Sequence, residues 1–246
     1  MRKPEGRLQE LVSRLQAACG ESLMSVVLYG SAVADDLHEK FSDVNVLVVL
    51  RRLEAKSAPA VSQVLRWWTR EEKLRPPLVM ELEELRESAD VFAIELFDIK
   101  RSHQTLFGAD VMADIEVPMN LHRIEVEHEL RTTLLKLRQH FLLGSDDESE
   151  LRAVLAKSIT SVLTLVRHAL IAAGADVGQD KAQTLQKAAD VFGVELNALH
   201  SVLDLREGRQ FNDIPELYHE YMTAIQKVAH ELDVRAPKRN LRRVHQ

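Results

Sequence analysis

The chain has 246 residues, of which 46% are hydrophobic and 28% are charged, as in an ordinary globular protein rather than a disordered one. Its 32 basic and 38 acidic residues leave a net charge of −6, which disfavours nucleic acid as a partner because such binders usually carry a cationic surface. The single cysteine, Cys19, excludes an internal disulfide framework and any zinc site built from several thiolates.

In residues 1–118, short apolar runs alternate with helical patterns. Four of the runs are strand candidates: Ser25–Tyr29, Val44–Leu50, Leu78–Leu82 and Phe92–Phe97. Between the second and third runs, residues 58–74 have helical spacing, and Pro76-Pro77 ends that helix. This order predicts a β-sheet that is covered by helices.

After Pro118 the strand patterns disappear. Helical patterns follow, with short breaks between them, at residues 121–143, 149–173, 180–192, 195–206 and 214–233. Short connections between helices favour an antiparallel bundle. The expected fold class is therefore α+β: a mixed β-sheet flanked by helices in residues 1–118, then an antiparallel α-helical bundle in residues 119–246 that ends in a loose basic tail.

The most apolar window, Ile159–Val177, contains Arg167 and His168, so it predicts a buried helix rather than a membrane span. The first residues lead into a charged amphipathic stretch without an apolar signal core. We therefore expect a soluble, cytoplasmic protein that has no membrane partner.

The segment with the clearest chemical signal runs from Gly30-Ser31 to Asn45. Glycine at a strand-to-helix turn lets a phosphate approach the backbone, and the helix N-terminus supplies N–H groups and a partial positive charge. Ser31 adds a hydroxyl there, and Ser42 and Asp43 lead into the next strand. Asp43 and Asn45 point to one side of that strand because strand side chains alternate. Two oxygen ligands beside a phosphate cradle are typical of magnesium-assisted phosphoryl chemistry.

Gly-Ser, eleven further residues and then Asp-hydrophobic-Asn at the start of a strand resemble the DNA polymerase β-like nucleotidyltransferase superfamily. The pattern is most similar to its bacterial branch of kanamycin-nucleotidyltransferase-like and minimal nucleotidyltransferases. That branch has a further carboxylate on a later strand, a position to which Glu95 is similar, and often a helical C-terminal domain. The resemblance implies transfer of a nucleoside monophosphate from a nucleoside triphosphate to an acceptor hydroxyl, with Mg²⁺ and in some cases Mn²⁺.

The resemblance assigns roles to particular residues. Gly30, Ser31 and Ser42 would bind the nucleotide; Asp43, Asn45 and Glu95 would hold the metal; Asp43 and Glu95 would be catalytic. Active sites between subunits are frequent in this superfamily, so a homodimer is one open oligomeric state. The acceptor, a small molecule or a protein, is not identified by the sequence.

Asn45 stands where an active enzyme of this superfamily has aspartate, which leaves a second function open. The amide removes one negative charge from the metal site, so the domain is either a nucleotidyltransferase or a nucleotide-binding sensor or interaction module without turnover. Glu81 competes with Glu95 as the third carboxylate, although Glu83 and Glu84 beside it indicate a helix start.

Two other patterns favour structural roles. Arg123 and His128 match the Arg-x4-His spacing of HEPN-type ribonucleases, but acidic residues between them favour a solvated charged face. Trp67-Trp68 could stack on bases, but such a pair more often packs in a core or at a domain boundary.

Overall fold

Two apolar strands form the middle of the first part of the chain, with a neighbouring strand on each side. The computed structural model describes residues 4–30, 33, 44–144, 146–178 and 180–235. β1 (Leu23–Tyr29) pairs antiparallel with β2 (Asn45–Leu50) and with β4 (His103–Gly108). β2 also pairs in parallel with β3 (Leu78–Glu81), so the order across this mixed sheet is β3-β2-β1-β4.

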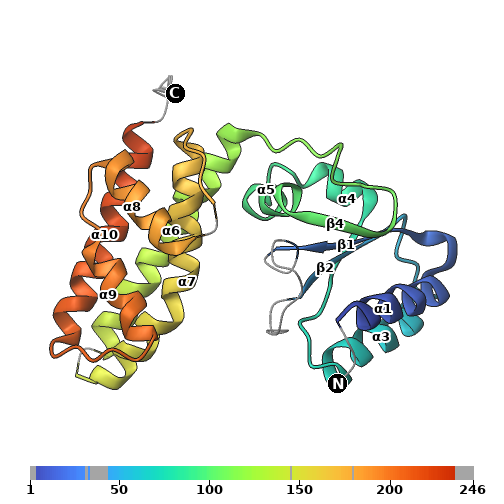
Figure 1. Ribbon diagram of the computed structural model, residues 1–246, viewed down its shortest axis with the longest axis horizontal. Coiled ribbons are helices and arrows are strands. Elements are labelled where there is room, and N and C mark those ends of the chain that lie inside the picture. The colour runs from blue at the N-terminus through green and yellow to red at the C-terminus, as the bar shows by residue number, and fades with distance from the viewer. Residues whose placement is uncertain (1–3, 31–32, 34–43, 145, 179, 236–246) are drawn as a thin grey trace, which may run out of the picture. The chain divides into compact units, whose positions relative to one another are not determined.

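Helices cover both faces of the sheet, as Figure 1 shows. On one face lie α1 (Pro4–Cys19), α3 (Ala58–Arg66) and the π-helical turn η3 (Trp67–Glu71); a short turn, η1 (Gly20–Ser22), joins α1 to β1. On the other face lie α4 (Leu82–Glu87) and α5 (Ala93–Arg101). Because both faces are covered, β1 and β2 are almost continuously apolar rather than alternating.

Successive side chains of β2 point to opposite faces of the sheet. Val46, Val48 and Leu50 pack in the core with α1 and η3, whereas Leu47 and Val49 pack in the core with α4 and α5. Asn45, at the start of β2, therefore shares the face that is covered by α4 and α5, since side chains two residues apart in a strand point the same way.

The strand prediction for Phe92–Phe97 is wrong, because residues 93–101 form the helix α5. Its buried residues Ala93, Leu96 and Ile99 recur at every third position, which is the spacing of a helical face. A short apolar run fits a buried strand and a buried helix equally well when its sequence is considered alone. The remaining strand is β4, which follows α5 directly and whose side chains are only partly buried.

The chain divides into two compact units, Met1–Pro118 and Met119–Gln246. The described part of the second unit is helical: α6 (Met119–Gly144), α7 (Glu148–Ala172), α8 (Lys181–Phe192), α9 (Asn197–Arg206) and α10 (Ile214–Val234). Asp147, Asp180 and Asp213 precede α7, α8 and α10, and each side chain accepts a backbone N–H of the first turn. The α+β fold class is thus confirmed. The basic tail, 236–246, lies outside the described residues.

α7 is the one described helix that is long and apolar enough, by length and composition alone, to cross a membrane. Its apolar residues are buried within the bundle, where α7 contacts α6, α8, α9 and α10. Arg167 and His168 are buried in its C-terminal half. The composition of α7 is therefore explained by its place as the core helix of the bundle.

Candidate functional site

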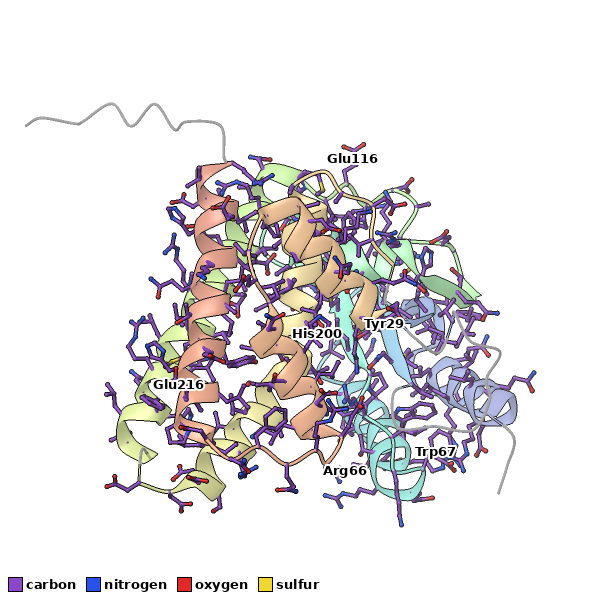
Figure 2. The ribbon with its side chains drawn as sticks, turned by 60° about the vertical axis from the view of Figure 1, so that its left-hand side comes forward. Tyr29, Arg66, Trp67, Glu116, His200 and Glu216 are labelled. Carbon is purple, nitrogen blue, oxygen red and sulfur yellow. The ribbon has the colours of Figure 1, made fainter. Side chains whose placement is uncertain are left out.

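Three strands present residues side by side where β1 ends. Tyr29, the last residue of β1, is paired with Asn45 at the start of β2 and with His103 at the start of β4. Tyr29, labelled in Figure 2, is half-buried and packs against the core on the α4 and α5 side of the sheet. The sheet register thus brings together residues that are up to 74 positions apart in the sequence.

Gly30 turns the chain immediately after β1. Its φ of 82° is a left-handed conformation that glycine adopts without strain. Its N–H donates to the Ser102 carbonyl at 3.1 Å, and its own carbonyl accepts the Val33 N–H at 3.0 Å. Since this amide is bonded within the protein, Gly30 would serve a ligand by its lack of a side chain rather than by its N–H group.

The Asn45 amide lies directly against the Gly30 turn. A Cβ atom added at Gly30 would be 3.2 Å from Asn45 Nδ2, closer than most such contacts. The polar end of Asn45 is therefore directed toward the turn that the sequence predicts as a phosphate cradle, on the α4 and α5 face of the sheet.

Glu95 reaches the same end of the sheet from a helix. It is exposed on the first turn of α5, which covers the face that Asn45 and Tyr29 share. Burial raises the pKa of the Tyr29 hydroxyl, the Glu95 carboxylate raises this pKa further, and the Arg75 guanidinium lowers it. Glu95 and Arg75 are thus both close enough to the end of β1 for their charges to act on Tyr29.

Glu81, the competing third carboxylate, has a structural role. It is paired with Leu50, at the end of β2 remote from Asn45. Its side chain caps α4 in a capping box with Glu84 and accepts the Leu53 N–H at 2.9 Å. These bonds stabilise the start of α4 and keep Glu81 away from the Gly30 turn.

β3 supplies an apolar residue at the place nearest to Asn45. Leu78 is paired with Leu47, so it lies on the same face of the sheet as Asn45, and 41% of its surface is exposed. Beside Asn45, the described part of β3 contributes no carboxylate.

Ser31, Ser42 and Asp43 lie outside the described residues, so their roles stay predictions. Among the residues that the structure does describe, no three His, Cys, Asp or Glu side chains are grouped so that they could hold a metal ion. The donor set that remains for a metal is the predicted Asp43 with Asn45 and Glu95. These are hard oxygen donors of the kind that suits Mg²⁺.

The other two sequence patterns are structural. Trp67, labelled in Figure 2, and Trp68 are both buried, so neither ring is available to stack on a base. Arg123 forms an ion pair at 3.3 Å with Glu127, one turn further along α6. Only 15% of the Arg123 side chain is exposed, so Arg123 is not part of the solvated face that the sequence predicted; its ion pair with Glu127 is a structural contact within α6.

Sequence reasoning missed Tyr29 and Arg75. Tyr29 was part of an apolar run that predicted a strand, and its position directly before Gly30-Ser31 was the available signal. Arg75 gave a weaker signal, its position before two prolines; only the pairing of β3 with β2 relates it to Asn45.

Ten chains in solved structures match this protein, among them spectinomycin adenyltransferase AAD(9) from Enterococcus faecialis, whose crystal structure was determined with ATP and spectinomycin. That likeness has a TM-score of 0.55 at 15% sequence identity and covers 90% of this chain and 99% of that chain. No protein-family model and no curated protein sequence matches the chain. At this identity the likeness concerns the fold, and the chain therefore has an α+β, nucleotidyltransferase-like fold.

Proposed function

We propose that the protein is a metal-dependent nucleotidyltransferase that moves a nucleoside monophosphate from a nucleoside triphosphate to a hydroxyl of a small molecule or a protein. The observation that carries the proposal is the packing of the Asn45 amide against the Gly30 turn, on the sheet face where Glu95 lies. A glycine turn with an amide donor beside it, and with the predicted carboxylate ligands near it, suits phosphate chemistry. The fold shared with an adenyltransferase supports the same class of reaction.

Each residue has a defined part in the proposed reaction. The bare backbone at Gly30 and the hydroxyls of Ser31 and Ser42 hold the triphosphate, and Asp43 and Glu95, with the Asn45 amide oxygen as a weaker ligand, hold Mg²⁺ or Mn²⁺. The bound metal would neutralise charge on the phosphate oxygens. Glu95 accepts the acceptor proton while the acceptor oxygen bonds to the α-phosphorus and the bond to the bridging oxygen breaks, which releases pyrophosphate.

A second candidate function is nucleotide binding without turnover, as a sensor or interaction module. Two observations favour it: Asn45 is neutral, and β3 begins nearest to Asn45 with Leu78, which is paired with Leu47, rather than with a carboxylate. One metal ion held by two carboxylates would suffice to bind a nucleotide, whereas a second ion needs more negative charge.

A transfer assay with nucleoside triphosphates labelled at the α-phosphate separates the two candidates. The assay contains Mg²⁺ or Mn²⁺ and mixtures of small-molecule and protein acceptors. A nucleotidyltransferase should produce a labelled acceptor and release pyrophosphate. Asp43→Asn and Glu95→Gln should abolish the label, whereas Glu87→Gln, an exposed acid at the end of α4, should not. Triphosphate binding without labelled product would overturn the proposal of a nucleotidyltransferase and support a nucleotide-binding sensor or interaction module. Absence of binding would overturn both.

The proposed partners are a nucleoside triphosphate and a hydroxyl acceptor, in a cytoplasmic protein. Homodimer formation stays open, and sedimentation of the purified chain with and without nucleotide would test it.

A further inference from the structure

Arg75 lies at the end of the sheet that carries Asn45. β3 and β2 run in parallel, with Leu78 opposite Leu47. The residues before Leu78 therefore extend toward the start of β2, where Asn45 is two positions before Leu47. Arg75, three residues before Leu78, approaches this end from the edge of the sheet.

The backbone of Arg75 is held in place by the core. The indole Nε1 of Trp68, a residue with no exposed surface, donates to the Arg75 carbonyl at 2.8 Å. The Leu74 N–H donates to the Trp68 carbonyl at 3.3 Å, and Pro76-Pro77 restricts the backbone on the other side. The side chain of Arg75 is exposed. The core thus fixes the backbone of Arg75, while its side chain reaches solvent at this end of the sheet.

The charge of Arg75 also acts on the site, because the guanidinium lowers the pKa of Tyr29, which Glu95 raises. A cation and a carboxylate thus both act on the Tyr29 hydroxyl. Tyr29 is paired with Asn45, so the charge of Arg75 acts at the end of the sheet where Asn45 lies.

We propose that Arg75 binds the phosphate groups of the nucleotide and supplies the positive charge that a second metal ion would otherwise provide. This rests on the proposed function, since it needs a triphosphate at the Gly30 turn. The planar guanidinium donates two parallel hydrogen bonds to phosphate oxygens and keeps its charge at every physiological pH. Because Asn45 replaces one carboxylate, the site can hold less positive charge as metal ions. The guanidinium of Arg75 supplies positive charge that neutralises the triphosphate in their place.

The test compares Arg75→Gln with Arg51→Gln by titration calorimetry. Arg51 is also exposed, but it follows the far end of β2 and is the matched control. The probes are Mg-ATP, inorganic tripolyphosphate and adenosine. Arg75→Gln should weaken Mg-ATP and tripolyphosphate binding about tenfold or more, because bonds to charged groups are the strong ones. Adenosine affinity should not change, and Arg51→Gln should bind all three probes as the unaltered chain does.

Arg75→Lys keeps the charge without the planar pair of donors, so it should recover part of the lost affinity. Tryptophan fluorescence, which comes from Trp67 and from Trp68 beside the Arg75 backbone, should stay unchanged in both variants and so exclude unfolding. Unchanged tripolyphosphate affinity in Arg75→Gln, or equal losses in Arg75→Gln and Arg51→Gln, would overturn the assignment of Arg75. Absence of nucleotide binding by the unaltered chain would instead overturn the proposed function itself.

Discussion

The Gly30 turn offers a sharp test of the site, because alanine there should affect both stability and ligand binding. Gly30 has φ of 82°, and a Cβ atom in such a conformation costs about 1–2 kcal/mol. Alanine also has less conformational freedom than glycine in the unfolded chain, which stabilises the folded state by about 0.4–1 kcal/mol. The net expectation is that Gly30→Ala lowers the free energy of unfolding by about 1 kcal/mol.

Gly20 provides the matched control in the same unit. Its φ is also positive, at 54°, but an added Cβ atom would meet nothing within 4 Å. Gly20→Ala should therefore cost about the same stability through backbone strain alone. At Gly30 the new methyl group would additionally lie 3.2 Å from Asn45 Nδ2, so the amide must move by a few tenths of an ångström.

Two measurements separate these effects. Both tryptophans, Trp67 and Trp68, belong to the first unit, so urea denaturation followed by their fluorescence reports the stability of that unit. Mg-ATP affinity, measured by calorimetry, should fall about tenfold in Gly30→Ala and stay unchanged in Gly20→Ala, because the methyl group occupies the proposed phosphate approach. If Gly30→Ala loses stability but binds Mg-ATP normally, the Gly30 turn is not part of a nucleotide site.

Asn45→Asp should make the apoprotein slightly less stable, because it places like charges together, and should tighten Mg-nucleotide binding; calorimetry that finds no change would remove Asn45 from the metal site. In the bundle, burial raises the pKa of Tyr218 to about 12, so the neutral hydroxyl stabilises the fold below pH 10 and this contribution is lost as the pH rises from 10 to 12. Urea denaturation followed by circular dichroism should show a smaller alkaline loss in Tyr218→Phe than in the unaltered chain, and an equal loss would contradict this origin. The buried His168 accepts from Arg167 through Nε2 at 2.9 Å and so donates through Nδ1 to His122 at 2.8 Å, because arginine can only donate. His168→Phe should lower bundle stability by about 1–3 kcal/mol in the same assay, and unchanged stability would show that these bonds contribute nothing.

Local patterns in the sequence predicted the α+β fold class correctly. The runs that became β1 and β2 are apolar because both of their faces are covered, and the helices after Pro118 carry their own periodicity. Glycine before a serine at the end of a strand identified the turn at Gly30, and the alternation of β2 placed Asn45 on one face. Each of these inferences depends on residues that are close together in the chain.

The residues whose neighbours are distant in the sequence were decided only by the tertiary structure. Glu95 lies on the helix α5. The sequence could not predict this, because the run Phe92–Phe97 is too short for its periodicity to separate a helix from a strand. β4 was not among the predicted strands, and its pairing with the edge of β1 became visible only in the tertiary structure. The pairing of β3 with β2 places Glu81 at the end of the sheet remote from Asn45, and it directs the chain that precedes β3 toward the start of β2. Such pairings join chain segments dozens of residues apart, and their free energy comes from burial and hydrogen bonds that no local window contains.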